Sequence, residues 1–232
     1  MTDYHGRVVV VTGGTGALGS AVVQALLARG AACVVPYVDP AEAARFPAKD
    51  RVALVGPADL ANESAVARLY DDAGVLWASI HLAGGFAMTA VGETRKADIL
   101  KMVEMNFFTC HLCCVAAVRA LRRSGQGGRI VNVAARPALE PRLASGMAAY
   151  GASKAAVAAL TQALAEEVAG DGILVNAVAP SIIDTPANRA AMPRAKHEQW
   201  PKVEEIAATI LFLASPANRV TRGAIVPVYG KS

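Results

Sequence analysis

The sequence predicts an α/β protein in which a doubly wound parallel sheet of about seven strands carries helices on both faces. Two observations support this prediction. Short β-branched runs alternate with longer helical segments along the whole chain, which is the pattern of a parallel sheet. The 232 residues also contain no internal repeat and no second-domain boundary, so we expect one domain over residues 1–232.

This alternation assigns each element in order. We expect strands at residues 7–11, 31–35, 51–55, 79–82, 129–133, 173–178 and 224–228. Apolar residues recur at helical spacing from a glycine-rich turn to residue 28 and over residues 63–72, 96–123, 150–169 and 203–214. Residues 182–200 contain prolines and little periodicity, which suggests a mobile flap that covers a substrate.

The composition indicates which kinds of partner and which cellular compartment to expect. The chain is 54% hydrophobic and 18% charged, as expected for an ordered globular protein. Its net charge of +4 is modest and its arginine cluster contains no aromatic residues, so no nucleic-acid partner is expected. Residues 1–6 lack the apolar core of a signal peptide, and no apolar run approaches the ~20 residues of a membrane span. We expect a cytoplasmic protein without a membrane partner.

The four cysteines lie in apolar stretches. Cys110, Cys113 and Cys114 crowd one helical segment, and Cys33 lies in a predicted strand. Such thiols usually act as small core hydrophobes. A disulfide framework is therefore not expected, and a reducing cytoplasm is the default compartment. We therefore expect no metal site, although a site that includes His111 remains the minor alternative.

A glycine-rich turn directly follows the first predicted strand. Residues 12–19 read Thr-Gly-Gly-Thr-Gly-Ala-Leu-Gly and run into a helix. Glycines let the backbone turn tightly and approach a pyrophosphate, whose charge is stabilised by the helix N-terminus. This context predicts a Rossmann unit that binds a dinucleotide. Its expected contacts are Gly13, Thr15, Gly16, Ala17, Leu18 and Gly19.

The end of the second strand bears on the choice between NAD(H) and NADP(H). An acid there binds the ribose of NAD, whereas an arginine accommodates the 2′-phosphate of NADP. Asp39 would repel a phosphate, and neither Thr15 nor Gly16 supplies a positive charge. These features favour NAD(H) over NADP(H). The preference is only weak, because Tyr37 is not an acid. Turn chemistry before Pro40 is an equally good reading of Asp39.

Tyr150 and Lys154 lie four residues apart at the start of a predicted helix. Positions i and i+4 share a helix face, so the phenol and the ammonium can address one spot. A phenol titrates near pKa ~10 in water, and a neighbouring ammonium is expected to lower that pKa. The pair predicts a general acid or base. A helix-start tyrosine beside an unrelated surface lysine is the alternative.

The glycine-rich turn, Asn106 and Tyr150-x-x-x-Lys154 occur in this order on one scaffold. In this combination the chain resembles the short-chain dehydrogenase/reductase family over nearly its whole length. The resemblance implies a single Rossmann domain that assembles into a homotetramer or homodimer through the helices at residues 96–123 and 150–169. It also implies an NAD(P)-dependent oxidoreductase that moves hydride between nicotinamide and a small carbonyl, alcohol or imine-like substrate.

The resemblance also implies roles for individual residues. Tyr150 would donate or accept the proton, Lys154 would bind the nicotinamide ribose and lower the Tyr150 pKa, and Asn106 would hold a relay water. Further cofactor contacts are implied at Tyr37, Asp59, Leu60, Ala83, Gly84, Gly85, Pro180, Ile182 and Thr185.

Several positions depart from the family pattern. Ala135 occupies the place of the family's catalytic serine, and the loss of such a donor typically costs ~10²–10³ in rate. Ser145 in the following loop is a candidate substitute, and a solvated loop serine without such a role is the alternative. His81 and Leu82 replace the two asparagines of an Asn-Asn-Ala-Gly turn, and Ser181 replaces a glycine.

The missing serine, Ala-Gly-Gly-Phe at residues 83–86 and Asp-Thr-Pro-Ala-Asn-Arg-Ala-Ala-Met-Pro at residues 184–193 resemble the dihydropteridine reductases. This resemblance implies reduction of a quinonoid dihydropterin by NADH, with Phe86 as a stacking platform. Ala135 and Met192 would also contact the substrate. Asn106 and Tyr37 differ from that subgroup, so shared flap architecture without a shared substrate stays open.

A hypothesis from another class is a catalytically impaired, cofactor-binding redox sensor or scaffold. Ala135 motivates it, whereas Tyr150, Lys154 and Asn106 oppose it.

Overall fold

The computed structural model describes residues 4–47 and 50–232. Residues 1–3, on which part of the signal-peptide expectation rests, lie outside the described residues. One parallel seven-stranded sheet has the order β3-β2-β1-β4-β5-β6-β7, which confirms the predicted fold class. Its strands are β1 (Val8–Thr12), β2 (Ala32–Pro36), β3 (Val52–Val55), β4 (Leu76–His81), β5 (Gly128–Val133), β6 (Ile173–Pro180) and β7 (Ile225–Val228).

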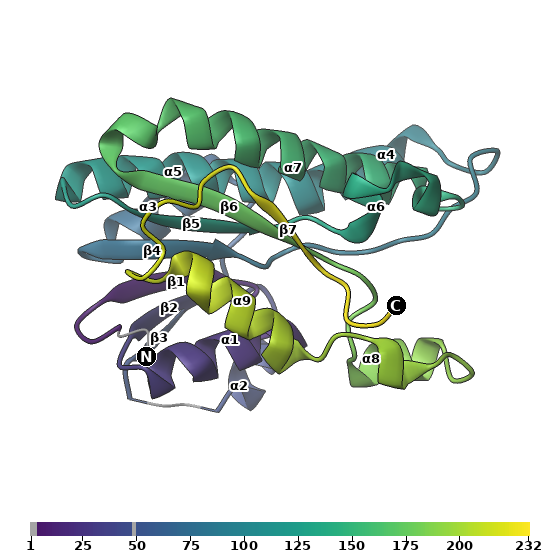
Figure 1. Ribbon diagram of the computed structural model, residues 1–232, viewed down its shortest axis with the longest axis horizontal. Coiled ribbons are helices and arrows are strands. Elements are labelled where there is room, and N and C mark those ends of the chain that lie inside the picture. Colours follow the sequence, from purple (N-terminus) through teal and green to yellow (C-terminus); the bar gives the residue numbers. More distant parts are fainter. Residues whose placement is uncertain (1–3, 48–49) are drawn as a thin grey trace.

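Helices cover both faces of this sheet (Figure 1). One face carries α3, α5 and α7, and the opposite face carries α1 and α9. The α-helices are α1 (Ala17–Ala28), α2 (Pro40–Arg45), α3 (Glu63–Asp71), α4 (Lys96–Met102), α5 (Thr109–Ser124), α6 (Arg136–Leu139), α7 (Ala148–Glu167), α8 (Pro186–Ala191) and α9 (Val203–Ala214). A π-helix spans Val103–Phe108, and 3₁₀ turns span Pro141–Ala144, Ala169–Asp171 and His197–Gln199.

The side chains of β1 alternate between two cores. Val9 and Val11 belong to a cluster built with α1 and α9. Val10 points the other way, into a cluster built with α3, α5 and α7. Because successive strand residues face opposite sides of a sheet, both faces of a covered parallel strand must be apolar. This requirement explains the continuous valine run on which the strand prediction rested.

Strand β4 begins at Leu76, three residues before the predicted start at Ser79. Leu76 pairs with Val8 of β1. The Trp77 indole donates a hydrogen bond of 2.9 Å to the Ala214 carbonyl at the end of α9. The strand start therefore depends on partners far away in the sequence.

The predicted helix over residues 96–123 contains a π-helical segment. Residues Val103–Phe108 form this wider turn between α4 and α5, and Asn106 is buried within it. Segments of this kind are rare and frequently occur at functional sites. The apolar periodicity gives no sign of the interruption.

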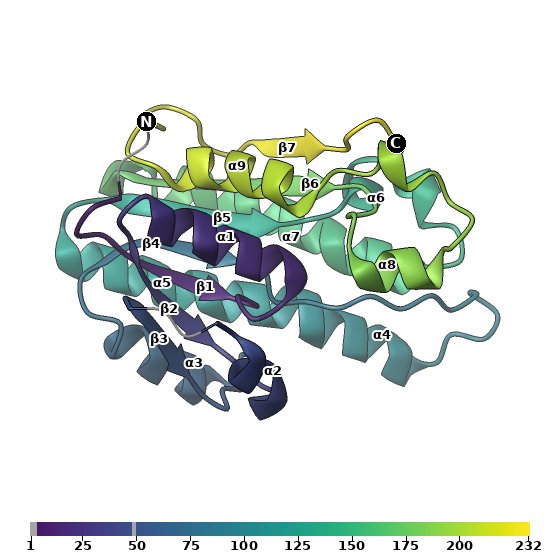
Figure 2. The ribbon, with the colours of Figure 1, turned by 90° about the horizontal axis from the view of Figure 1, so that it is seen from below.

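Residues 182–200, predicted as an irregular flap, contain the short helix α8. Thr185 caps α8 by accepting from the Asn188 amide, and the Arg189 guanidinium pairs with both Asp184 oxygens at 2.6 and 2.8 Å. The segment ends at the buried Trp200. Helices α4, α6 and α8 gather at the same end of the molecule in both views, the end toward which the strands run (Figures 1 and 2).

Among the described residues, one helical run, Lys96–Ser124, is long and apolar enough to cross a membrane. Its α5 portion buries one side, including Cys113, Ala117 and Leu121, against the sheet and α3. A core helix of a soluble protein passes the same test of length and composition, and this packing identifies α5 as such a core helix.

Candidate active site

The predicted site motifs meet at the carboxyl edge of the sheet. The strand order reverses between β1 and β4, and in open α/β sheets ligands bind in the crevice at such a switch point. The glycine-rich turn follows β1, residues 82–86 follow β4, and Ala135 and Ser181 follow β5 and β6 closely. The topology therefore brings together segments that are widely separated in the sequence.

The glycine-rich turn fits a pyrophosphate. Gly16 is the N-cap of α1 and provides no capping side chain, so the first amides of the helix, including those of Ala17 and Leu18, are not capped from that position. A Cβ on Gly19 would overlap the Gly13 carbonyl oxygen, which explains why this tight turn needs glycine. Beside the turn lies a cavity of about 280 Å³. Its lining residues are Thr15, Gly16, Ala17, Ser20, Glu42, Arg45, Phe46 and Pro47.

The acid that was expected to repel a 2′-phosphate has another role. Asp39 caps α2 by accepting 2.8 Å from the Ala41 amide, which supports the turn reading of this residue. Glu42 on α2 instead lies beside the glycine-rich turn, where its carboxylate accepts 2.9 Å from the Thr15 hydroxyl. Sequence reasoning missed Glu42 because the short helix that carries it was not predicted.

The remaining positions expected near the adenine end lie around the ends of β2 and β3. The Tyr37 hydroxyl donates 3.0 Å to the Gly56 carbonyl. Asp59 is exposed and accepts from the Ala61 amide, whereas Leu60 is buried. The exposed Asp59 is therefore the more accessible of the predicted pair.

Asn106 holds the turn after β4 against helix α7. Its amide oxygen accepts 2.9 Å from the Gly85 amide, and its amide nitrogen donates to the Gly85 carbonyl at 3.0 Å and to the Ser153 hydroxyl at 3.1 Å. A Cβ on Gly84 would lie 2.6 Å from the Asn106 oxygen and 3.4 Å from the Lys154 ammonium. Gly84 therefore needs to be glycine for Asn106 and Lys154 to approach this turn. The neighbouring Ala83 amide donates 3.3 Å to the Thr12 hydroxyl.

Tyr150 and Lys154 project from the first turns of α7. The buried Lys154 ammonium donates 2.9 Å to the Val133 carbonyl at the end of β5. Burial lowers the Lys154 pKa to about 8 and raises the pKa of the Tyr150 phenol to about 12. The expected lowering of the Tyr150 pKa by Lys154 is therefore not found in this structure, because the direction of the shift is set by burial of the phenol and not by the ammonium.

Phe86 lies directly beside Tyr150. Their ring centroids are 4.9 Å apart and the planes meet at 81°, an edge-to-face pair. Phe86 is nevertheless 60% exposed, so most of its ring is free to contact a ligand. Ala135 is buried immediately before α6, and the exposed Ser145 lies in the loop after the 3₁₀ turn.

The residues expected around the nicotinamide follow β6. Pro180 is buried and Ile182 is 41% exposed, whereas Thr185 caps α8. Ser181, which replaces the family's glycine, donates 2.9 Å to the Tyr229 carbonyl. Met192 is half-buried at the end of α8.

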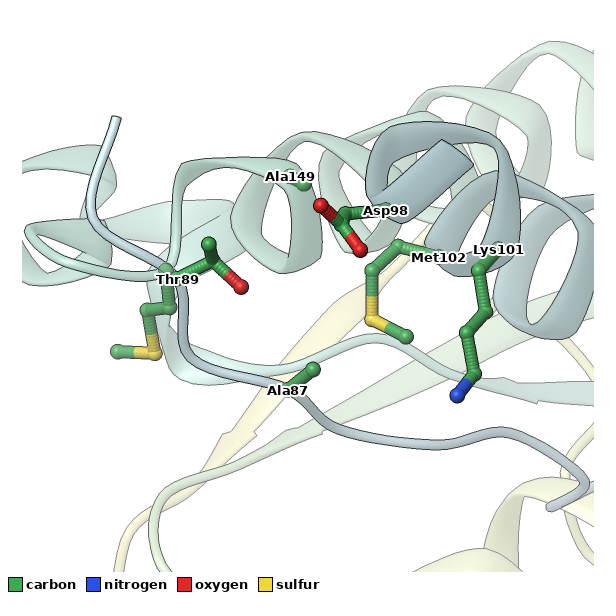
Figure 3. Close-up of a pocket in the computed structure, with 7 residues that line it drawn as sticks. Ala87, Thr89, Asp98, Lys101, Met102 and Ala149 are labelled. Atoms are coloured by element: carbon green, nitrogen blue, oxygen red, sulfur yellow. The ribbon is translucent and has the colours of Figure 1, made fainter. Parts of the chain in front are cut away.

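A second cavity, absent from the sequence predictions, lies between the segment after Phe86, helix α4 and the start of α7 (Figure 3). Its volume is about 80 Å³, well below the ~300–1,000 Å³ of typical small-molecule sites. It is therefore too small to hold a substrate alone. Its lining residues are Ala87, Thr89, Asp98, Lys101, Met102, Met147 and Ala149.

Comparison with known proteins agrees with this geometry. Residues 7–196 match the short chain dehydrogenase family. Cis-4-hydroxycyclohexanecarboxylate dehydrogenase of Sinomonas cyclohexanicum is 35% identical over 97% of this chain and 95% of its own length. Galactitol 2-dehydrogenase of Rhizobium johnstonii is 34% identical over 96% and 93%.

Solved structures show the same fold. A short-chain type dehydrogenase/reductase from Mycobacterium ulcerans superposes with a TM-score of 0.89 at 25% identity, covering 99% of this chain and 90% of that one. The matched range, residues 7–196, spans most of the chain, and the glycine-rich turn, Asn106 and the Tyr150–Lys154 pair lie within it. The protein belongs to the short-chain dehydrogenase/reductase family and is an NAD(P)-dependent oxidoreductase.

Proposed function

We propose that this enzyme interconverts a small carbonyl or imine-like compound and its reduced form, with Tyr150 as the general acid or base. The main support is the placement of Tyr150 beside the exposed Phe86 and one helix turn from the buried Lys154. The two relatives named as dehydrogenases of a hydroxycyclohexanecarboxylate and of galactitol favour an alcohol/carbonyl substrate.

The nicotinamide supplies hydride in reduction and accepts it in oxidation. In the direction of reduction, Tyr150 would donate its phenolic proton to the oxygen or nitrogen of the acceptor. Lys154 would hold the nicotinamide ribose through its ammonium group. The proton is then replaced from solvent.

The side chain and the backbone carbonyl of Asn106 have different roles in this proposal. Its side-chain oxygen and both amide hydrogens are engaged by Gly85 and Ser153. The backbone carbonyl, which lies in the π-helix, is therefore the group that would hold a relay water between Lys154 and solvent. The side chain instead positions the turn after β4.

We propose NAD(H) as the preferred cofactor. Glu42 accepts from Thr15 at the edge of the 280 Å³ cavity. A carboxylate in this place would bind ribose hydroxyls and repel a 2′-phosphate, although Arg45 in the same lining would offset part of that repulsion.

Mutation of Tyr150 to Phe tests the proposed proton donor. We expect kcat/KM to fall by ~10²–10⁴, with NADH affinity unchanged, because only the hydroxyl is removed. The measurement is NADH oxidation across a panel of ketones, followed by alcohol oxidation with NAD⁺. Turnover that survives the mutation would exclude Tyr150 as the acid. Wild-type protein that binds NADH but turns over no member of the panel would favour the redox-sensor hypothesis.

A quinonoid dihydropterin is the second candidate substrate. The broad exposed ring of Phe86 and the methyl of Ala135 suit a flat acceptor that needs no serine hydroxyl. Steady-state NADH oxidation with freshly generated quinonoid dihydropterin tests it. Rapid turnover that Phe86→Ala reduces would support pterin chemistry, whereas turnover of ketones alone would leave the flap motif as shared architecture.

We also propose a cytoplasmic homotetramer or homodimer. Ile99, Leu100 and Phe108 are about half exposed along α4 and the π-helix, and this apolar surface suits pairing with a second copy.

A further inference from the structure

Three side chains that can ligate a metal meet in the core between β4 and α5. His81 ends β4, and Cys110 and Cys114 lie one turn apart on α5. All three are buried, with exposed fractions of 3%, 5% and 1%. Their ligand atoms lie within 4.8 Å of one another. His111, which the sequence placed among these cysteines, instead packs edge-on against Phe107.

The spacing is close to that of a tetrahedral metal site. With Zn–S near ~2.3 Å and Zn–N near ~2.0 Å, neighbouring donors around zinc lie about 3.5–3.8 Å apart. The Cys114 sulfur is 3.5 Å from His81 Nδ1 and 3.5 Å from Asn132 Oδ1. His81 Nδ1 and Asn132 Oδ1 are 2.8 Å apart, so this pair would open by about 0.5 Å when a cation replaces the proton between them.

The histidine is oriented by its other ring nitrogen. His81 Nε2 lies 2.8 Å from the Ser79 hydroxyl and 3.2 Å from the Tyr70 hydroxyl, both buried. Histidines that bind metal usually donate this second N–H to such a partner. Transfer of the ring proton from Nδ1 to Nε2 would free Nδ1 toward the cysteines without creating an unpaired group.

The charges also balance. Two thiolates and a neutral imidazole around a divalent cation sum to zero, which suits a site without solvent. A disulfide is disfavoured, because Cβ atoms four residues apart on a helix lie ~5–6 Å apart, beyond the ~3.5–4.5 Å that a disulfide requires.

We infer that His81, Cys110 and Cys114, with Asn132 Oδ1 as the fourth ligand, form a buried binding site for a thiophilic divalent cation of the zinc type. The rival reading is a hydrogen-bonded polar cluster that holds no ion. The inference concerns a site separate from hydride transfer and does not depend on the substrate proposed above.

Cobalt(II) is the probe for this site, because tetrahedral cobalt thiolates absorb visible light. Reduced full-length wild-type protein, in the presence of NADH, should take up one equivalent of Co²⁺ with a thiolate-to-metal charge-transfer band, and Zn²⁺ should displace it. Uptake should strengthen as pH rises, because two thiol protons are released. The Cys110→Ser and Cys114→Ser variants should lose the band. Ser79→Ala should weaken binding by ~10–100-fold through the histidine.

Cys113→Ser is the matched control. Cys113 is buried on the same helix but is not among the three clustered donors, so the band should persist in this variant. His81→Asn gives a second test that keeps the fold, because it restores the family's asparagine, and it should abolish the band without lowering the thermal midpoint. A folded wild-type protein that shows no band after prolonged incubation would overturn the inference. A band that survives in both Cys110→Ser and Cys114→Ser would overturn it equally.

Discussion

Lys154 is the residue whose environment has the clearest consequence for pH dependence. Its ammonium is buried, donates to the Val133 carbonyl, and has its pKa lowered to about 8 by desolvation. Below that pH the side chain carries the charge that our proposal uses to bind the nicotinamide ribose. Above it the neutral amine predominates. The proposed role of Lys154 therefore predicts weaker cofactor binding in alkaline solution.

We expect the NADH dissociation constant to rise as pH increases through about 8, by up to tenfold per pH unit. NADH fluorescence titration from pH 6 to 10 measures it. Lys154→Arg is the matched control, because a guanidinium stays protonated over this range and its profile should be flat. A flat wild-type profile would contradict the role assigned to Lys154.

Ala135 allows a second test at the scale of one residue. Because a hydroxyl in this place stabilises a developing oxyanion, Ala135→Ser should raise kcat/KM for ketones, by up to ~10²–10³. It should leave reduction of a quinonoid dihydropterin nearly unchanged. Paired kinetics on both substrates check this, with Ala134→Ser as the control for a new buried hydroxyl next door. No gain with any ketone would place the missing donor elsewhere.

Glu42 gives a third test. Glu42→Gln removes the carboxylate beside Thr15, so NADPH affinity relative to NADH should increase about tenfold, equivalent to ~1.4 kcal/mol. Dissociation constants for both cofactors measure the change. Glu63→Gln, on the distant α3, should leave the ratio unaltered. An unchanged ratio in Glu42→Gln would show that another group selects the cofactor.

At the scale of the element, two glycines of the β1–turn–α1 unit serve different purposes, one for packing and one for cofactor binding. Gly19 is a packing requirement, since its Cβ would overlap the Gly13 carbonyl. Gly16 is different, because its Cβ would lie 3.4 Å from the same oxygen and would stand at the helix N-terminus where a pyrophosphate approaches. The two substitutions therefore separate stability from binding.

Gly19→Ala should destabilise the fold by ~1–3 kcal/mol, which lowers the thermal midpoint by ~2–12 °C in a chain of this size. Gly16→Ala should keep the midpoint and lose NADH affinity. Thermal unfolding and NADH titration of both variants make the comparison. Equal midpoints for the two variants would show that the turn relaxes around the Gly19 methyl.

At the scale of the whole molecule, the half-exposed apolar residues of α4 and the π-helix favour association. Phe108→Glu should shift the protein to a smaller species in light scattering, because it places a charge on the proposed contact surface. Val75→Glu, at an exposed position outside that surface, is the control and should not change the mass. A wild-type monomer would contradict the oligomer proposal directly.

The spacing of residues along the chain was enough to predict the fold class, the first strand, the glycine-rich turn and the Tyr150–Lys154 pair. The alternation of strands and helices predicted the parallel sheet, the valine run predicted β1, and the position of glycines after it predicted the turn. The four-residue spacing of Tyr150 and Lys154 placed both in the first turns of α7. These features depend on residues near one another in sequence, where backbone geometry is set by short-range sterics and hydrogen bonding.

Only the tertiary structure decided the features that depend on burial and on distant partners. The start of β4 required β1 and α9, and Glu42 reached Thr15 only after α2 folded against the turn. The Tyr150 pKa rises because packing removes water from the phenol, which no spacing rule contains. His81 meets Cys110 and Cys114 because α5 packs against β4. Desolvation and long-range contact arise from how elements pack, so they appear only when the whole chain is assembled.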